Sequence, residues 1–370
     1  MTLTVGFITP DLTMRHGWAQ YSLSLLRALS QRDDITLHII TARSSPPLPE
    51  LPAHPILPDL VPRQRFFLPA LLPQRAAVHR LLQSCDLIHV TAEPYAPLGA
   101  WIAADRPLLI TAHGSYVHLP QRESHLARHL YRRAFQRATL VCVSRYTARI
   151  AARVTPGVKT VVVPNGVEAS RFTALEHTPQ SPPLILSVGA LKRRKGQLEL
   201  VRALPAVRQQ FPHVQAVLVG STTAEPAYTA RIEQTIRELG LQDIVHLAGH
   251  VPDAALLDYY RKATLFVLPS MNEGWKFEGF GLVHLEASAA ALPVIGTRDC
   301  GAEDAIDDHH TGLLVSQTAI AAELPRAIIT LLTDPAQAAA MGAAGRARAL
   351  RQTWSHVAAQ MHDVYNQHRS

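Results

Sequence analysis

Short runs of β-branched and aliphatic residues alternate with longer helical patterns along the whole of this 370-residue chain. Strands that are connected by helices in this way form parallel sheets with helices on both faces. In the first half we expect strands at residues 3–9, 35–41, 86–90, 107–112, 138–143 and 160–163. In the second half we expect them at residues 184–188, 215–219, 244–247, 265–268, 294–295 and 313–315. The pattern predicts an α/β fold with two doubly wound, Rossmann-like domains facing a central cleft.

A polar, proline-bearing stretch separates the two series of strands and has the composition of a linker. We therefore expect a first domain at residues 1–175, a linker at 176–183 and a second domain at 184–350. The end of the chain reads as one or two helices, and we expect residues 351–370 to cross back to the first domain. Ligands of such folds bind beyond the carboxyl ends of the strands, so the residues after each strand are the candidate site residues.

The composition is that of a globular protein, with an apolar fraction of 47% and a charged fraction of 18%. No apolar run reaches the roughly 20 residues of a membrane span, and the first residues lack the basic start of a signal peptide. Three scattered cysteines, Cys85, Cys142 and Cys300, indicate a reduced, cytoplasmic setting. No Asp-x-Asp and no zinc-type cluster occurs, so no bound metal is indicated, and the glycine motifs of nicotinamide and phosphate-loop enzymes are missing.

Positive charge is concentrated in the first half of the chain. Residues 1–165 carry a balance of +9, whereas residues 166–370 carry −2. The densest basic stretch, residues 121–137, reads as a helix whose apolar side would hold Leu126, Leu130, Ala134 and Phe135. Two interpretations stay open: a surface that contacts anionic lipid or a phosphorylated acceptor, which would make the protein membrane-associated, and an ordinary solvated face. No reader motif accompanies the charge, so nucleic acid is not an expected partner.

Two carboxylates, Glu278 and Glu286, stand eight residues apart around a glycine-rich break. The stretch from Leu282 onward favours helix and is apolar nearly all round, so Glu286 should lie on a buried helix. A buried carboxylate needs donors, and the two hydroxyls of a ribose can supply them together. Gly279 and Gly281 predict a loop that runs into the helix N-terminus, where amides and the helix dipole favour a diphosphate between the two carboxylates.

Two further candidates follow strands of the first half. Gly17 lies between the first strand and a helix, where a glycine lets a phosphate approach the helix amides, although an ordinary turn glycine fits equally well. His113 follows the fourth strand, where a neutral imidazole could donate one hydrogen bond and accept another. A single histidine at a strand end is commonly structural, so its position alone leaves its role open.

A cluster of four consecutive cations, residues 192–195, follows the first strand of the second half and Gly189. Because a helix begins near Gln197, these cations would surround a helix N-terminus and form an anion site. A diphosphate leaving group gains negative charge as its bond breaks, so a lysine or arginine at this place would lower the barrier directly. The alternative is a solvated basic turn.

Together these residues resemble the retaining glycosyltransferases of the GT-B fold, family 4, which include sucrose synthase-like enzymes and bacterial mannosyl- and glucosyltransferases. The most specific part of the resemblance is Glu278-Gly-Phe-Gly-Leu282 with Glu286-Ala. Four further motifs support it: Pro164-Asn-Gly-Val, Gly189 with Lys195-Gly196, Cys300-Gly-Ala-Glu303, and Thr311-Gly-Leu-Leu. The motifs occur in the family's order and span nearly the whole chain.

The resemblance implies a metal-independent transfer of a hexosyl unit from a nucleoside diphosphate sugar to an acceptor hydroxyl, with retention of the anomeric configuration and no further cofactor. The acceptor would be a glycan, a lipid-linked molecule or a small molecule on the side of the first domain. In same-face attack the departing diphosphate helps to take the acceptor's proton, so Glu278 would not be a nucleophile. Domain closure would bring Gly17 and His113 onto the donor and exclude water.

The same resemblance implies roles for individual residues. Glu278, His113 and Lys195 would be the catalytic residues: the first two face the sugar, and Lys195 neutralises the diphosphate. His250 and Val251 would contact the base through backbone atoms. The full donor-binding set would be Gly17, Gly189, Arg194, Lys195, His250, Val251, Gly279, Phe280, Gly281, Leu282 and Glu286.

Three positions depart from the family's pattern. Ala190 stands where the family often has an arginine, so that charge would come from the neighbouring basic cluster. His16 replaces the first glycine of a usual pair before the first helix. Glu273-Gly274 could compete with Glu278 as the start of the acidic motif, but the spacing to Glu286 favours Glu278.

Two other functions stay open. A nucleotide-sugar-binding subunit that has lost catalysis and supports a partner enzyme would explain Ala190 and His16. A phosphorylase-like enzyme of the same fold would use phosphate as its acceptor. The sequence leaves the sugar, the base and the acceptor undefined, because the side chains that select them are expected on proline-rich loops such as residues 44–74.

Overall fold

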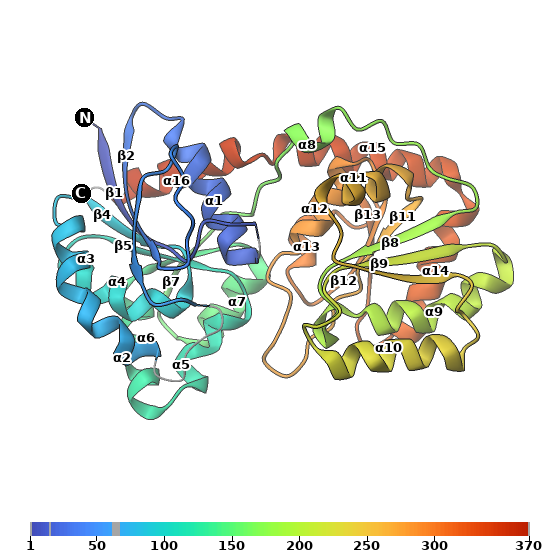
Figure 1. Cartoon of the computed structure of the whole chain (residues 1–370), viewed down its shortest axis with the longest axis horizontal. Helices are drawn as coiled ribbons and strands as arrows, with labels where there is room; N and C mark the ends of the chain where they lie inside the picture. Colours follow the sequence, from blue (N-terminus) through green and yellow to red (C-terminus); the bar gives the residue numbers. More distant parts are fainter. Residues whose placement is uncertain (1, 15, 61–66, 369–370) are drawn as a thin grey trace. The chain divides into compact units, whose positions relative to one another are not determined.

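The structure is a computed structural model that describes residues 2–14, 16–60 and 67–368 (Figure 1). The chain divides into two compact units. The first contains the chain up to Asn165 together with the segment from Trp354 onward, and the second contains Gly166–Thr353. The chain therefore passes between the units twice, and its last helix belongs with its first strands.

The first unit is built on a seven-stranded parallel sheet with the strand order β3-β2-β1-β4-β5-β6-β7. Its strands are β1 (Leu3–Ile8), β2 (Ile35–Ala42), β3 (Ala53–Leu57), β4 (Leu87–Val90), β5 (Leu108–Ala112), β6 (Thr139–Cys142) and β7 (Lys159–Val162). Its helices are α1 (Gly17–Ser30), α2 (Phe67–Leu71), α3 (Arg75–Leu82), α4 (Ala96–Ala103), α5 (Leu119–Arg122), α6 (His125–Arg137), α7 (Arg145–Val154) and α16 (Trp354–Gln367). Short 3-10 turns are η1 (Leu72–Gln74), η2 (Glu93–Tyr95) and η3 (Ser115–His118).

The second unit is built on a six-stranded parallel sheet with the strand order β10-β9-β8-β11-β12-β13. Its strands are β8 (Leu184–Val188), β9 (Gln215–Val219), β10 (Val245–Gly249), β11 (Leu265–Val267), β12 (Val294–Thr297) and β13 (Gly312–Val315). Its helices are α8 (Ser170–Thr173), α9 (Gln197–Gln210), α10 (Pro226–Glu238), α11 (Asp253–Lys262), α12 (Leu282–Ala289), α13 (Ala302–Ala305), α14 (Ile320–Thr333) and α15 (Pro335–Arg351), with the 3-10 turn η4 (Arg193–Lys195).

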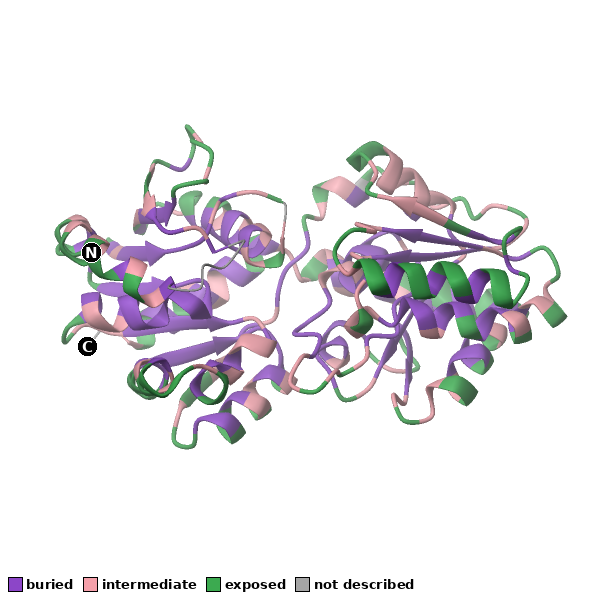
Figure 2. Cartoon of the chain, turned by 60° about the horizontal axis from the view of Figure 1, so that its bottom comes forward, coloured by how far each residue is buried: buried purple, intermediate pink, exposed green. Residues whose placement is uncertain are grey.

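Helices cover both faces of each sheet. In the first unit α1 packs with α16, while α3, α4 and α6 form another group (Figure 1). In the second unit α9 packs with α10 and α14, while α12 packs with α15. Strands β4, β5, β6 and β8 are buried along their whole length, and the outward faces of the helices are exposed (Figure 2). Continuous burial of this kind is typical of a parallel sheet between two helical layers.

The predicted fold class, two doubly wound parallel sheets, is confirmed, and all the expected strands are present with small shifts at their ends. Strand β3 was not predicted. It contains Pro55, which cannot donate to a ladder and is tolerated mainly at sheet edges. Because β3 is the edge strand of the first sheet, its tertiary position makes it a strand despite its sequence.

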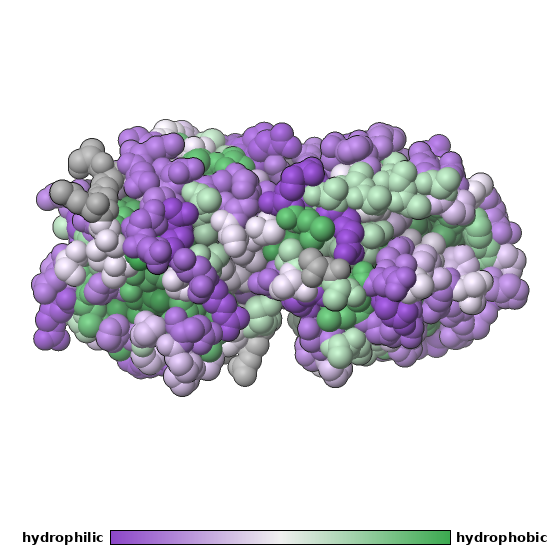
Figure 3. All heavy atoms as spheres, turned by 90° about the horizontal axis from the view of Figure 1, so that it is seen from above, coloured by the Kyte–Doolittle hydropathy of each residue, from purple (hydrophilic) through white to green (hydrophobic). Residues whose placement is uncertain are grey.

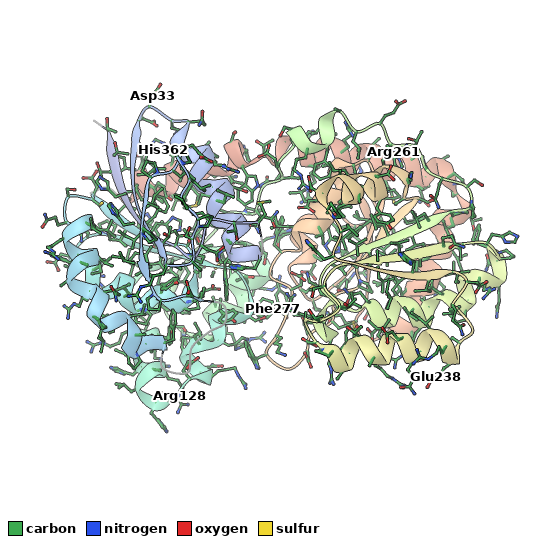
Figure 4. All side chains as sticks on the ribbon, viewed as in Figure 1. Asp33, Arg128, Glu238, Arg261, Phe277 and His362 are labelled. Carbon is green, nitrogen blue, oxygen red and sulfur yellow. The ribbon has the colours of Figure 1, made fainter. Side chains whose placement is uncertain are left out.

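The units divide at residue 165, which lies before the boundary that we expected at residue 175. The expected linker, residues 176–183, packs on the second unit. The amides of Thr178 and Gln180 donate to carbonyl oxygens at the end of α11, at 3.0 and 2.9 Å, close to the Arg261 side chain labelled in Figure 4. Since those hydrogen bonds fix its backbone, the segment is part of the second unit rather than a free connection.

The basic helix of the first unit buries a different face from the one expected. Helix α6 buries Ala127, Tyr131, Ala134 and Phe135. The prediction that Leu126 lies on the apolar side is wrong, because its side chain is 72% exposed. The physical reason is Tyr131, whose hydroxyl donates to the carbonyl oxygen of Pro94 at 3.1 Å and whose ring takes the centre of the buried face.

On the face seen in Figure 3, hydrophilic side chains are interspersed with hydrophobic ones in both units. Within the described part of the chain, no helix combines the length and the apolar character needed to cross a membrane.

Candidate functional site

The ends of β8 and β11 bring Lys195 and Glu278 into direct contact. Lys195 belongs to η4 after β8, and Glu278 lies in the loop after β11, next to the Phe277 labelled in Figure 4. The Nζ of Lys195 donates to Oε2 of Glu278 at 2.6 Å, and the Nη1 of Arg194 donates to the same oxygen at 2.8 Å. Residues from two separate motifs of the sequence therefore form one ion-paired cluster.

The cluster determines the charge of Glu278, which is buried with 8% of its surface exposed. Burial alone would raise its pKa, but Lys195 and Arg194 outweigh burial and lower the pKa of Glu278 to about 2. Ser270 adds a hydroxyl donor at 3.4 Å. Glu278 is therefore ionised at neutral pH, accepts hydrogen bonds from several directions, and is a weak base.

Two glycines allow the close packing of this cluster. Gly196 follows η4 with a φ of +71°, and a Cβ there would lie 1.8 Å from the carbonyl oxygen of Pro269. Gly281 precedes α12 with a φ of +80°, and a Cβ there would lie 2.5 Å from Nδ1 of His284. Both positions combine a backbone conformation that favours glycine with a lack of room for any side chain.

The loop into α12 is anchored from the neighbouring β12 end. The amide of Gly301 donates to the carbonyl oxygen of Glu278 at 2.8 Å. A Cβ at Gly301 would lie 2.0 Å from the carbonyl oxygen of Gly279, so the two backbones are in close contact. Phe280 is buried, and Leu282 is the first residue of α12. The structure thus places the whole predicted segment at one strand end, directly before a helix N-terminus.

Glu286 lies on α12, which is buried as its apolar pattern predicts. Its Oε2 accepts a hydrogen bond from the Tyr260 hydroxyl at 3.2 Å, and its Oε1 lies 4.0 Å from Nη1 of Arg171. Arg171 also forms an ion pair with Asp253. The protein itself therefore supplies donors that the sequence argument assigned to a ribose alone.

The remaining candidates of the second unit also follow strands. Gly189 follows β8 with a φ of +152°, and its carbonyl packs against Gly220, where a Cβ would lie 2.2 Å from that oxygen. His250 and Val251 follow β10, and His250 is exposed. Because β10, β9 and β8 are neighbours in the sheet, these residues lie along one edge.

In the first unit, His113 follows β5 and is held by two hydrogen bonds. Its amide donates to Oε1 of Glu93 at 2.7 Å, and its ring Nε2 lies 2.7 Å from the carbonyl oxygen of Thr91. Burial lowers the pKa of His113 to about 4, although the bond to Thr91 opposes this effect. A neutral ring that donates from Nε2 to a carbonyl keeps an acceptor lone pair on Nδ1. The ring of Tyr21 packs edge-on against it, with centroids 4.7 Å apart.

Gly17 begins α1 and is exposed, and a Cβ there would meet no atom within 4 Å. Neither its backbone nor its packing requires glycine, so the open space beside the helix N-terminus is what the small residue provides. His16 caps the helix: its Nδ1 accepts from the amide of Ala19 at 3.4 Å, and its Nε2 lies 2.8 Å from Oδ2 of Asp11. The histidine that replaces the family's glycine therefore has a structural role in this chain.

Glu93 was not a sequence candidate, yet it lies in η2 after β4 and contacts His113, the residue that follows β5. It is fully buried, accepts from the His113 amide, and accepts from the Trp18 indole nitrogen at 3.2 Å. Burial raises the pKa of Glu93 to about 7 in spite of these donors. The one available signal was its position three residues after the end of β4, similar to the signal that selected His113 after β5.

The described residues offer few candidates for a metal site or a reactive thiol. Across residues 2–14, 16–60 and 67–368, no group of three or more His, Cys, Asp or Glu side chains is placed to hold a metal ion. The cysteines Cys85, Cys142 and Cys300 are free and buried. Burial raises the pKa of their thiols, to about 11 for Cys85 and about 12 for the other two, which makes them poor nucleophiles.

Solved structures with the same architecture cover nearly the whole chain. Sucrose-phosphate synthase from Thermosynechococcus elongatus aligns with a TM-score of 0.79 at 24% identity over 99% of both chains. The HepE protein of Anabaena, solved in complex with UDP and glucose, aligns with a TM-score of 0.76 at 21% identity over 99% of this chain and 100% of that one. These similarities show the GT-B fold.

Comparisons with related sequences identify the family to which the chain belongs. A GDP-mannose-dependent alpha-(1-6)-phosphatidylinositol monomannoside mannosyltransferase of Mycolicibacterium smegmatis is 33% identical over 70% of each chain. A D-inositol 3-phosphate glycosyltransferase of Kineococcus radiotolerans is 34% identical over 56% of this chain and 51% of that one. The family models "Glycosyltransferase Family 4" and "Glycosyl transferases group 1" match residues 16–171 and 172–348. This chain therefore belongs to the family 4 glycosyltransferases of the GT-B fold.

Proposed function

We propose that the protein is a retaining glycosyltransferase that moves a hexosyl unit from a nucleoside diphosphate sugar to an acceptor hydroxyl, with no metal ion and no further cofactor. The observation that carries this proposal is the contact of Lys195 and Arg194 with Glu278 beside the N-terminus of α12. It combines two cations, helix amides and an ionised carboxylate at one strand end. Those groups match a diphosphate and the hydroxyls of the sugar attached to it.

In this mechanism the two cations bind the diphosphate, and Glu278 accepts hydrogen bonds from sugar hydroxyls. As the bond from the anomeric carbon to the diphosphate breaks, negative charge grows on the leaving oxygen, and Lys195 and Arg194 stabilise that charge. The acceptor oxygen bonds to the same face of the anomeric carbon and its proton passes to the diphosphate, so the configuration is retained. Glu278, with a pKa of about 2, is too weak a nucleophile to attack the sugar.

Further groups of both units complete the proposed donor site. Glu286 accepts hydrogen bonds from the ribose hydroxyls in addition to that from Tyr260. His250 and Val251 contact the base through their backbone, and Gly189 lets the diphosphate approach the end of β8. In the first unit, Gly17 leaves the N-terminus of α1 open to the diphosphate.

His113 is proposed to face the sugar with the acceptor lone pair of Nδ1. The Thr91 carbonyl can only accept, so it holds the proton of the neutral ring on Nε2. A lone pair binds a hydroxyl and repels a phosphate oxygen. His113 therefore favours the sugar over the diphosphate as its neighbour.

The acceptor is proposed to be an anionic, lipid-linked or inositol phosphate-type molecule bound by the first unit. Two observations support this choice. Relatives from two groups are named for phosphatidylinositol monomannoside and for D-inositol 3-phosphate, and the first 165 residues carry a balance of +9. By the same argument GDP-mannose is the first donor to test, and the protein is proposed to act in the cytoplasm at an anionic membrane surface.

The direct test is release of nucleoside diphosphate from a panel of sugar nucleotides, in the presence and absence of inositol phosphates and phosphatidylinositol vesicles, with excess chelator. We expect release that depends on acceptor and persists with chelator. Glu278→Gln and Lys195→Ala should each reduce kcat/KM by at least about 100-fold, or about 2.7 kcal/mol. The matched control is Lys262→Ala on the outer helix α11, which should be fully active; full activity in both site variants would disprove the assignment of these residues.

The same panel separates the two alternatives. Tight donor binding without product from any acceptor would support a binding subunit that has lost catalysis. Sugar phosphate formed with inorganic phosphate as acceptor would support a phosphorylase-like enzyme. Analysis of the product's anomeric configuration tests retention, and inversion would rule out same-face attack.

A further inference from the structure

His284 is a buried histidine within the donor segment to which no role has been given so far. It belongs to α12 and stands between Glu278 and Glu286 in the sequence. Its side chain is inaccessible to solvent. Its Nδ1 lies 3.2 Å from the carbonyl oxygen of Gly281, and its Nε2 lies 3.2 Å from the carbonyl oxygen of Leu268. One ring therefore connects the loop before α12 to the end of β11.

Both ring nitrogens face oxygens that can only accept a hydrogen bond. A neutral imidazole carries one N–H, so it satisfies one carbonyl and directs a lone pair at the other, whereas an imidazolium satisfies both. The backbone encloses the ring tightly. A Cβ at Gly281 would lie 2.5 Å from Nδ1, and a Cβ at Gly296 would lie 3.2 Å from Nε2. The ring therefore occupies space that glycines at these two positions leave free.

The electrostatic balance around the ring keeps it neutral at neutral pH. Burial lowers the pKa of His284 to about 4. Of its charged neighbours, Glu278 raises this pKa and Lys195 lowers it. The groups that pack on the ring from the strands are uncharged, namely Phe266 of β11, edge-on at 5.6 Å, and Gly296 of β12. Besides burial, the pKa of His284 therefore depends on the balance between Glu278, which raises it, and Lys195, which lowers it.

We propose that His284 is a positioning residue of the donor site that takes up a proton when the donor's diphosphate binds to Lys195; the proposal rests on the proposed function. The anion neutralises Lys195 and adds negative charge near the ring, and both changes favour the imidazolium. The imidazolium then donates to Leu268 and Gly281 together and fixes the start of α12 against β11. The proton comes from solvent and returns to it when the diphosphate leaves.

Calorimetric titration with a nucleoside diphosphate sugar, in buffers of different ionisation enthalpy near neutral pH, measures the protons taken up on binding. A sugar nucleotide is the appropriate probe because its diphosphate diester, unlike a free nucleoside diphosphate, has no group that titrates near neutrality. We expect an uptake of a measurable fraction of one proton and a dissociation constant that falls as the pH is lowered below neutrality. Ring-nitrogen shifts of labelled histidine should show one ring changing from neutral to protonated on donor binding.

The variant His284→Gln cannot take up a proton and keeps one donor toward the carbonyls. We expect it to fold, to bind the donor several-fold more weakly, and to show neither proton uptake nor the pH dependence of the dissociation constant. His213→Gln, which changes an exposed histidine of the same unit, is the matched control and should behave as the wild type does. Lys192→Met tests whether that half-buried lysine takes the proton instead, and an uptake lost only in this variant overturns the proposal.

The outcomes separate the two levels of inference. Donor binding without proton uptake, or with uptake unchanged in His284→Gln, overturns the role of His284 and leaves the proposed function standing. If no sugar nucleotide binds, both proposals fall. Should His284→Gln not fold, the nitrogen shifts of the wild type decide, because a ring that stays neutral at saturating donor contradicts the proposal.

Discussion

At the scale of single residues, two buried carboxyls show how neighbours set the protonation state of one chemical group. Burial raises the pKa of both. Glu278 has two cations within hydrogen-bonding distance, and its pKa is about 2. Among the described residues, the donors to Glu93 are amides and an indole, and its pKa is about 7. Glu278 therefore keeps its charge under all physiological conditions, whereas Glu93, which accepts a hydrogen bond from the His113 amide, is expected to change charge near neutral pH.

This difference predicts a pH-dependent stability that Glu93→Gln should remove. Because the pKa of Glu93 is raised from 4.5 to about 7 in the folded state, its stabilising contribution is complete below pH 4.5 and is lost as the pH rises through about 7. The shift corresponds to about 3 kcal/mol. We expect urea unfolding of Glu93→Gln to show a flatter pH profile than the wild type, so that the variant gains relative stability as the pH is raised from about 5 to about 8.

The matched control for this prediction is Glu176→Gln, which changes an exposed carboxyl and should leave the pH profile of the wild type unaltered. Identical profiles for Glu93→Gln and the wild type would show that Glu93 does not titrate in the folded protein. Glu93→Gln should preserve the hydrogen bond from the His113 amide, because the glutamine oxygen still accepts it.

At the scale of elements, the candidate site of the second unit is held together by contacts between strand-end loops. The turn after β8 contacts the end of β11 where Gly196 meets Pro269, and the end of β12 contacts the loop before α12 where Gly301 meets Gly279. These contacts place backbone directly against backbone. A side chain at Gly196 or Gly301 would separate loops that the Lys195–Glu278 contact requires to be close.

Gly196→Ala is therefore expected to destabilise the second unit and to abolish activity. Two effects add up there: a φ of +71°, which costs alanine about 1 to 2 kcal/mol, and a Cβ 1.8 Å from the Pro269 carbonyl oxygen. Gly240→Ala isolates the first effect, because Gly240 has a φ of +63° and no atom within 4 Å of its Cβ position. Chemical unfolding should show a clearly larger loss for Gly196→Ala, and equal losses would disprove the packing argument.

The exposed side of helix α6 allows a test of the proposed contact with an anionic membrane. Leu126 is 72% exposed on a helix whose exposed side also holds Arg132 and Arg133. An apolar side chain among arginines can insert between lipid headgroups while the cations bind them. We expect co-sedimentation with phosphatidylglycerol vesicles, reduced several-fold by Leu126→Asp and by high salt.

Leu239→Asp is the control for that measurement, since Leu239 is also an exposed leucine, 42% accessible, but lies in the second unit. It should bind vesicles as the wild type does. If the wild type does not sediment with vesicles, or if Leu126→Asp and Leu239→Asp reduce its sedimentation equally, α6 is an ordinary solvated helix.

At the scale of the whole molecule, the last helix completes the first unit. The Tyr365 hydroxyl of α16 lies 2.7 Å from Nδ1 of His89, whose Nε2 lies 2.8 Å from the Thr111 hydroxyl, all of them buried. Trp354, the first residue of α16, packs edge-on against Tyr21 with ring centroids 5.6 Å apart. Tyr21 in turn packs against His113, so the C-terminal helix supports the ring of a candidate site residue.

Deletion of residues 354–370 should therefore destabilise the first unit and leave the second unit intact. Hydrogen exchange should show lost protection in β1, β4 and β5, with protection in β8 to β13 unchanged. Tyr365→Phe is the milder variant: it leaves the His89 nitrogen without its partner and should cost about 1 to 3 kcal/mol in the first unit. Equal loss of protection in both units on deletion would contradict this assignment of α16.

The sequence allowed the strands and the residues that follow them to be predicted, because buried parallel strands are continuous apolar runs. It did not show which of those residues would meet. Lys195 and Glu278 are 83 residues apart, and only the order of strands in the sheet brings β8 next to β11. Leu126 was misplaced because a helical pattern does not show which of two overlapping faces a large ring such as Tyr131 will occupy.

Glu93 was missed for a different reason. A single glutamate after a strand looks like any exposed turn residue, and its importance depends on Trp18 and His113, which lie far from it in sequence. His284 was hidden in the same way, because an apolar helix can accommodate one histidine and only the positions of Gly281 and Leu268 show that both its nitrogens are engaged.

The double passage of the chain between the units has a consequence for gene architecture. The second unit is one uninterrupted stretch, and its two ends are joined where the Val167 amide donates to the Gln352 carbonyl oxygen at 2.9 Å, beside a parallel bridge from Val167 to Thr353. The second unit is thus inserted into the sequence of the first unit, and its two ends are adjacent. Under the proposed function, in which this unit binds the donor, exchange of the single DNA fragment that encodes it between family members is expected to transfer donor preference in one step and to leave the first unit unchanged.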